Sequence, residues 1–272
     1  MNPRKPQPQA GNARPTVKTL AQATGYSIAT ISKALRDSPV VTPETKERIR
    51  EAALKAGYQA NMRGVSLRAG KTFQAAVLMP VTVAEGFEWD GVEYSQILSG
   101  ISQALEGSPY RIAVHIIRDA DDGRLVAQRI VEAGLADGLI FSGIRAEDPR
   151  IDFLVERDFP FVALGRCRKA LPYAHVDVDN DWAAHAATRR LIEGGHRRIA
   201  LINPDGRLSY AMDRIDGFHR AFAQAKLAPC DDLIAEGGLS THFGKQSALH
   251  LRRLPDPPTG FVCVNEATTL GV

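Results

Sequence analysis

Residues 16–35 read TVKTLAQATGYSIATISKAL, and this stretch predicts two short helices joined by a glycine turn. Thr16 is a good N-cap for the first helix, and Gly25 ends it, as glycine does at many helix C-termini. Ser27 can cap the second helix, which carries apolar residues at helical spacing. Two helices separated by a tight turn are typical of a helix-turn-helix, whose second helix enters the major groove of DNA.

A third helix follows. Thr42, Pro43 and Glu44 combine an N-cap, a proline at the first helical position and a carboxylate in the first turn. Gly57 closes this helix. The sequence therefore predicts an all-α helix-turn-helix domain over residues 15–60.

The charge distribution sets this part of the chain apart. Residues 1–72 contain 13 Lys and Arg against 4 Asp and Glu, whereas the remainder contains 21 against 27. A basic head on an acidic body is expected to meet a polyanion, although a solvated basic segment is the alternative. Residues 1–14 are rich in Pro, Gln and Asn without an apolar run, so we expect a disordered tail and no signal peptide.

The stretch 16–35, together with VTPET at 41–45 and Gly57-Tyr58, resembles the helix-turn-helix of the LacI/GalR (lactose-repressor) family of bacterial transcription regulators. Thr19 and Thr24 depart from the usual acid and alanine of that family. The resemblance implies double-stranded operator DNA as a partner. The DNA-binding residues that it implies in the head are Thr16, Ser27, Ile28, Ala29, Thr30, Ser32 and Lys33.

Within that set the residues have different expected roles. Ile28 and Ala29 correspond to the two specificity positions and can touch only thymine methyl groups, because they carry no hydrogen-bonding group. Lys33 corresponds to a position that reaches guanine or phosphate. Core packing for Ile28 and a solvated surface role for Lys33 are the alternatives.

Residues 61–72 read NMRGVSLRAGKT and resemble the family's hinge, a helix that folds when two subunits meet on DNA. The resemblance implies that Asn61 contacts DNA and that Leu67 wedges into the minor groove. Gly64 stands where the family usually has alanine, and an interior glycine costs a helix about 1 kcal/mol. We therefore expect a hinge that is disordered off DNA, with a plain linker as the alternative.

From residue 73 onward, short apolar runs alternate with amphipathic stretches, which predicts an α/β fold with doubly wound parallel sheets. The expected strands are 75–81, 111–117, 138–141, 161–164, 198–202 and 260–264. The expected helices are 94–105, 123–133, 151–157, 182–193, 210–225 and 241–251. Phosphate-binding glycine loops are absent from the sequence, so no nucleotide cofactor is expected.

The body also resembles the family, through VDVDN at 176–180, LIEGGHRRIA at 191–200 and RIDGF at 214–218. The resemblance implies a periplasmic-binding-protein-like (type I) sensor with subdomains at 73–178 and 179–272. It also implies that Val272 falls early, leaving the second subdomain incomplete and without a helix after Asn265. His196, inside the second motif, is expected to have a structural role.

A small-molecule effector, expected to be a carbohydrate, would lie between the two subdomains. Arg214 has a planar fork that suits paired hydroxyls, and Asn265 can both donate and accept hydrogen bonds. Glu266 replaces the family aspartate beside it, while Phe87 or Trp89 could stack on a sugar face. The alternatives are a structural salt bridge for Arg214 and packing under a loop for the two aromatic residues.

The remaining sequence patterns limit the classes of function that we expect. No nucleophile–base constellation, histidine pair with metal spacing or long apolar run occurs in the sequence, so we expect no enzyme, no metal and no membrane span. The three widely spaced cysteines suit reduced thiols in the cytoplasm. The expected protein is a homodimeric repressor, and the alternative is a solute-binding protein with a basic N-terminal extension.

Overall fold

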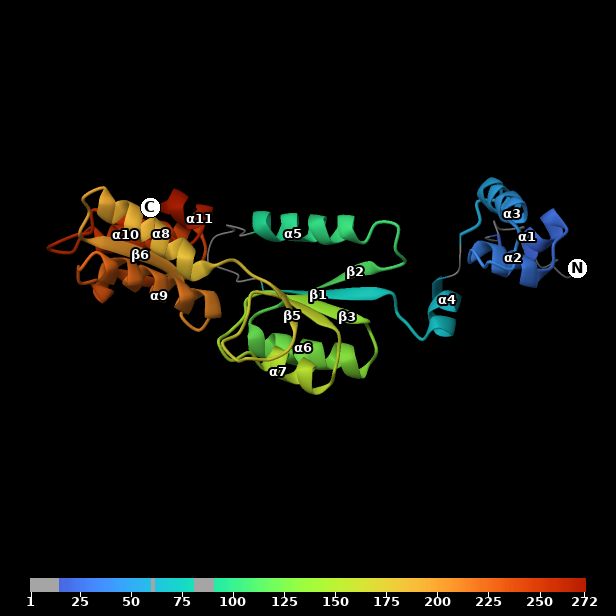
Figure 1. Cartoon of the computed structure of the whole chain (residues 1–272), viewed down its shortest axis with the longest axis horizontal. Coiled ribbons are helices and arrows are strands. Elements are labelled where there is room, and N and C mark those ends of the chain that lie inside the picture. The colour runs from blue at the N-terminus through green and yellow to red at the C-terminus, as the bar shows by residue number, and fades with distance from the viewer. Residues whose placement is uncertain (1–14, 60–61, 81–90) are drawn as a thin grey trace, which may run out of the picture. The chain divides into compact units, whose positions relative to one another are not determined.

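A computed structural model describes residues 15–59, 62–80 and 91–272 (Figure 1). The chain divides into two compact units, the first ending at Gly70 and the second covering Lys71–Val272. Across the described ranges, no helix is long and apolar enough to cross a bilayer.

The first unit contains the expected three-helix domain, formed by α1 (Val17–Thr24), α2 (Ile28–Leu35) and α3 (Pro43–Lys55). Side-chain caps begin all three helices, at Thr16, Ser27 and Thr42. Gly25 has a φ of 74°, a left-handed conformation that an L side chain would strain, so it suits the turn between α1 and α2. The buried core of the domain consists of Leu20, Ile31, Ala34, Val41, Ile49 and Ala53.

The same unit contains α4 (Met62–Ala69), which covers the expected hinge. The helix forms although Gly64 lies inside it. Gly64 is therefore expected to lower the stability of this helix in the free chain and not to prevent its formation. Within α4, the Leu67 side chain is 86% exposed. An apolar side chain so exposed on a short helix has no packing role in the described part of this unit.

The second unit begins with a five-stranded sheet, every pair of which is parallel, in the order β2-β1-β3-β4-β5. Helices α6 (Ala120–Glu132) and α7 (Pro149–Glu156) cover one face of it (Figure 1), where the main hydrophobic cluster lies. A third helix, α5 (Gly91–Ala104), follows β1 in the chain. The strands are β1 (Gln74–Pro80), β2 (Arg111–Ile117), β3 (Gly138–Phe141), β4 (Phe161–Leu164) and β5 (Ala174–Val176).

The chain then forms a second parallel sheet, in the order β7-β6-β8. All six residues of the central strand β6 are buried, because one cluster packs on each of its faces. The strands are β6 (Ile199–Pro204), β7 (Ile234–Gly237) and β8 (Gly260–Cys263), and η1 (Asp231–Leu233) is a short 3-10 helix. The helices are α8 (Asn180–Glu193), α9 (Ser209–Gln224), α10 (Thr241–Leu251) and α11 (Glu266–Gly271).

The fold class expected from the sequence is confirmed, with differences in detail. Strands 111–117, 138–141 and 161–164 and helix 241–251 have the predicted bounds, while Val81, the expected end of the first strand, lies outside the described residues. The expectation that no helix follows Asn265 is wrong. Helix α11 forms there because Asn265 and Thr268 cap it reciprocally.

Candidate functional site

Helix α2 presents one face to solvent and the other to the core of its domain. Ile31 and Ala34 are fully buried, whereas Ile28, one turn earlier, is 53% exposed. Core packing is therefore not the role of Ile28. Ala29 and Lys33 are also exposed, and they flank this face of the helix.

The N-terminus of α2 is fixed by hydroxyl groups. The Ser27 hydroxyl accepts a hydrogen bond from the Thr30 amide at 3.1 Å, and the two hydroxyl oxygens lie 2.9 Å apart. Ser32 is half-buried, and its carbonyl accepts from the Arg36 guanidinium at 2.9 Å. The hydrogen bonds of Ser27 and Thr30 therefore hold the exposed N-terminal end of α2 in one conformation.

Thr16 has the same capping role for α1. Its hydroxyl accepts from the Thr19 amide at 3.2 Å, and its own amide donates to the Thr19 hydroxyl at 2.7 Å. Thr19 therefore performs the reciprocal capping for which an acid is usual. Its departure from the family pattern leaves the start of the domain intact.

Asp37 forms ion pairs with two of the basic side chains of this domain. Its carboxylate lies 3.0 Å from the Lys46 ammonium and 2.8 Å from the Arg50 guanidinium. The hydrogen bond from Lys46 and the two neighbouring positive charges hold the pKa of Asp37 below its ordinary value. In contrast, among the residues that the structure describes, Lys33 has no ion-pair partner, so its charge is available to an anion.

Of the remaining residues implied to meet DNA, Leu67 lies exposed on α4 and Asn61 falls outside the described residues. Phe87 and Trp89, two of the expected effector residues, also lie in an undescribed segment. The structure therefore gives positions for Arg214, Asn265 and Glu266 only, among the residues expected to meet an effector.

Arg214 lies on α9, which follows strand β6. Its guanidinium Nε donates to the side-chain oxygen of Asn180 at 3.1 Å, at the start of α8. Asn180 is buried, and its amide in turn donates to the Val178 carbonyl at 2.9 Å. A buried amide that is itself held in place fixes the orientation of the arginine fork.

Asn265 and Glu266 follow strand β8, the parallel neighbour of β6. The Asn265 side-chain oxygen accepts from the Thr268 amide at 2.9 Å, and its nitrogen donates to the Leu239 carbonyl at 3.1 Å. Asn265 therefore already uses both kinds of hydrogen-bonding group to cap α11 and to hold the neighbouring chain. Glu266 is exposed in the first turn of α11.

The loop after β3 contains residues that the sequence reasoning missed. The Ser142 hydroxyl lies 3.2 Å from the Tyr94 hydroxyl of α5, and the Ile144 carbonyl accepts from the Ser209 amide of α9 at 2.8 Å. Arg150, only 1% exposed, donates to the Ser142 and Gly143 carbonyls and pairs with buried Asp148 at 2.6 Å. Ser142 directly follows a predicted strand, so the rule that ligands meet the carboxyl ends of parallel strands was the signal available for it.

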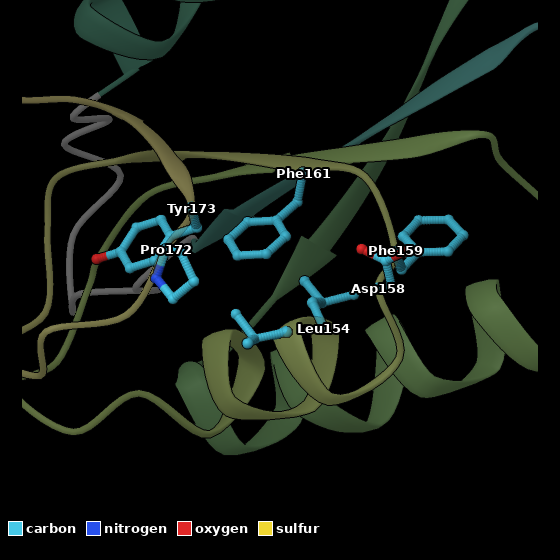
Figure 2. Close-up of a pocket in the computed structure, with 7 residues that line it drawn as sticks. Leu154, Asp158, Phe159, Phe161, Pro172 and Tyr173 are labelled. Atoms are coloured by element: carbon cyan, nitrogen blue, oxygen red, sulfur yellow. The ribbon is translucent and has the colours of Figure 1, made fainter.

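A cavity of about 240 Å³ lies at the other end of this sheet, by the start of β4 (Figure 2). Phe161 and Tyr173 stack there with ring centroids 5.4 Å apart, above Leu154 of α7. Burial raises the pKa of Tyr173 to about 12. None of the predicted site residues lines this cavity, and no group of three His, Cys, Asp or Glu side chains within the described ranges is placed to bind a metal.

Two protein families match the chain. Residues 16–61 match the family described as bacterial regulatory proteins, lacI family, and residues 83–272 match periplasmic binding proteins and sugar binding domain of LacI family. The transcriptional regulator AglR of Rhizobium meliloti is 32% identical over 256 residues, which cover 94% of this chain and 71% of AglR.

Solved structures agree with this similarity. The complex of the transcriptional regulator CelR with cellobiose is 25% identical, with a TM-score of 0.62 over 95% of this chain and 76% of CelR. The lac repressor dimer bound to operator and the anti-inducer ONPF has a TM-score of 0.74 at 20% identity, with 95% of this chain and 76% of that chain covered. The second comparison bears on the fold alone.

Proposed function

Because the chain belongs to the LacI family of bacterial transcriptional regulators, it is a DNA-binding regulator, and we propose that it is a repressor that responds to a carbohydrate. The observation that carries the DNA-binding part is the exposed face of α2 in a folded three-helix domain. A helix with a buried inner face and a capped, solvent-exposed N-terminus has the form that major-groove recognition requires.

Each residue of the head that is expected to meet DNA has a role in this proposal. Ile28 and Ala29 contact thymine methyl groups, and Lys33 reaches a guanine or a phosphate. The hydroxyl groups of Thr16, Ser27, Thr30 and Ser32 lie near the backbone of the duplex. Contacts to phosphate fix the register of the protein and carry no sequence information themselves.

The hinge extends this interface into the minor groove. Leu67 inserts between base steps when the hinge helices of two copies pair, and Asn61 contacts DNA beside it. The active form is thus a homodimer on a near-palindromic operator. The functional division of the chain in this proposal is a tail at 1–14, a head at 15–60, a hinge at 61–72 and sensor subdomains at 73–178 and 179–272.

The effector binds where the two sensor subdomains meet. Arg214 supports this proposal best, because buried Asn180 orients its guanidinium and because α9, which carries Arg214, directly follows β6. Asn265 and Glu266 follow the adjacent strand, and Phe87 or Trp89 supplies an apolar surface. The relative CelR is known as a complex with cellobiose, which makes an oligosaccharide the first class of effector to test.

The protein acts by binding alone, without a catalytic step, and it works in the cytoplasm, where operator DNA is. A solute-binding protein with a basic extension is the weaker candidate. It leaves unexplained why residues 16–61 match a family of DNA-binding regulators. It also leaves the apolar Ile28 exposed without a purpose.

Selection of duplexes from a random pool by the full chain tests the proposal. The expected result is enrichment of a near-palindromic site, to which the protein binds tightly in a salt-dependent manner. Cellobiose is then added as the first effector probe, followed by other disaccharides. A ligand of the regulator should change operator affinity by about 5- to 150-fold. A pool without a shared motif would contradict the proposed function.

A further inference from the structure

The residues at the junction between the hinge and the sensor donate hydrogen bonds to one carboxylate, that of Asp137. Thr72 donates to Asp137 Oδ1 twice, from its amide at 2.8 Å and from its hydroxyl at 2.9 Å. The Phe73 amide donates to Asp137 Oδ2 at 2.9 Å, and Tyr110 adds a side-chain hydrogen bond. Both carboxylate oxygens are therefore occupied by the two residues that connect the hinge segment to β1.

Phe73 adopts an unusual backbone conformation at this point. Its φ of 53° lies in the left-handed region, which is unfavourable for a bulky residue that is not glycine. Such a conformation persists only where its surroundings determine it fully. Here its amide is bound to Asp137, its carbonyl accepts from the Arg111 amide at 2.9 Å, and its ring packs against Tyr110 at 5.6 Å.

The carboxylate is held in its charged form. Burial raises the pKa of Asp137, but the hydrogen bonds from Thr72, Phe73 and Tyr110 outweigh it and bring the pKa below its ordinary value. The Asp137 amide also donates to the Gln74 carbonyl at 2.8 Å. Asp137 thus contacts three consecutive residues at the start of the sensor.

Asp137 immediately precedes β3, a strand of only four residues. The other end of β3 leads to Ile144, whose carbonyl accepts from the Ser209 amide at the start of α9. That helix carries Arg214, the residue proposed to bind effector. One short strand therefore connects the sensor loop that contacts α9 with the carboxylate that holds the hinge junction.

We propose that Asp137 is a positioning residue, which holds the backbone of Thr72 and Phe73 at the start of the sensor and thereby supports simultaneous binding by the two heads of a dimer. This inference rests on the proposed function, since it requires a dimer that binds two half-sites. Simultaneous binding multiplies affinity only when the geometry of the connection permits it. Loss of Asp137 should therefore weaken two-site binding without changing the affinity of one head for DNA.

The test compares two duplexes, one with both selected half-sites and one with a single half-site, by fluorescence anisotropy on the full chain. In Asp137→Asn, one acceptor oxygen becomes an amide nitrogen that cannot accept from an N–H group. The ratio of two-site to single-site affinity is expected to fall by about 5-fold or more, the lower range of allosteric coupling. Single-site affinity should stay within about twofold of wild type.

Thr72 supplies an independent pair of variants. Thr72→Val removes the hydroxyl donor and should lower the ratio in the same direction, whereas Thr72→Ser keeps the donor and should preserve it. Asp152→Asn is the matched control, because Asp152 forms an ordinary ion pair with Lys169 at 2.9 Å on α7. It should behave as wild type.

An unchanged ratio in folded Asp137→Asn would overturn the inference. If that variant fails to fold, an unchanged ratio in Thr72→Val overturns it instead. Failure of the wild-type chain to bind either duplex would refute the proposed function itself, and the inference with it. A loss of single-site and two-site affinity in equal measure would show general damage to the protein, which also contradicts a positioning role.

Discussion

The Ser27 hydroxyl accepts from the Thr30 amide at 3.1 Å, so the residue that caps α2 also lies at the end of the helix proposed to meet DNA. Capping and recognition therefore use the same short segment. The cap satisfies an amide that the helix leaves without a partner, and it keeps Ile28 and Ala29 on the exposed face. Substitutions at Ser27 can separate the stability of the head from its affinity for DNA.

Ser27→Asp is expected to fold as well as wild type and to lose operator binding. Aspartate caps helices as well as serine does, so the thermal stability of the domain should be retained. Its negative charge faces phosphate, and operator affinity should fall about tenfold or more. Ser27→Asn, a neutral cap, is the matched control, and equal operator affinity for the two variants would contradict the assignment of this helix end to the interface.

Asp37→Asn should strengthen binding to DNA. It releases Lys46 and Arg50, while asparagine tolerates the left-handed φ of 56° at this position. Affinity for a nonspecific duplex should rise about two- to fivefold, with a steeper salt dependence, in an anisotropy titration. Weaker binding would show that Asp37 has another role in the interface.

The ion pairs of Asp37 with Lys46 and Arg50 also predict how DNA binding responds to pH. Because the pKa of Asp37 is lowered in the folded protein, its ion pairs are fully present above the ordinary pKa of 3.8 and are lost only as pH falls through the lowered value. Titration of this group therefore leaves DNA affinity unchanged between about pH 5 and 8. A change in that window that disappears in Asp37→Asn would contradict this.

Gly64→Ala should stabilise the hinge helix. A methyl group at Gly64 would meet only the end of the Arg68 side chain, at an ordinary distance of 3.6 Å. Alanine favours a helix interior by about 1 kcal/mol over glycine, so operator affinity should rise by up to about fivefold. Gly70→Ala is the contrasting variant, since Gly70 has a φ of 62° and should not tolerate alanine. No gain in affinity for Gly64→Ala would mean that hinge folding does not limit binding.

Arg150→Met should destabilise the sensor strongly. The change leaves the Asp148 carboxylate buried without its partner, and the free energy of unfolding should fall by about 3–5 kcal/mol in a urea titration. The exposed pair between Arg189 and Glu193 of α8 is the control, because Arg189→Met should cost about 1 kcal/mol or less. Adding Asp148→Asn to Arg150→Met should recover part of the loss, and an equal loss in both single arginine variants would contradict the account of the buried pair.

Local patterns predicted most of the fold. The runs at 111–117, 138–141 and 161–164 are apolar and bounded by turn residues, so their ends are readable from the sequence. Strand β5 was missed because its three residues are Ala-His-Val, exposed at the edge of the sheet. Strand β7 was missed because Ile234–Gly237 contains only two apolar residues, which are followed directly by the charged Glu236.

The sites were less predictable where distant residues meet. Helical spacing separates exposed Ile28 from buried Ile31, and the family pattern located both. The contact of Asp137 with Thr72 spans 65 positions, and no local signal indicates it. Asn265 was assigned from its chemistry to an effector, yet the same chemistry also suits a helix cap, and the structure uses it as one.

The most direct test of the central claim, that α2 presents Lys33 and its neighbours to a DNA groove, is a salt titration of operator binding with wild type and Lys33→Ala. Log K is expected to fall linearly with log salt concentration, with a slope near −0.9 for each phosphate contact, so about −4 or steeper for several contacts. Lys33→Ala should bind more weakly, by about 1–3 kcal/mol if Lys33 reads a base, or with a slope shallower by about one if it meets phosphate. Binding that is independent of salt, or an unchanged affinity and slope in Lys33→Ala, would contradict the account.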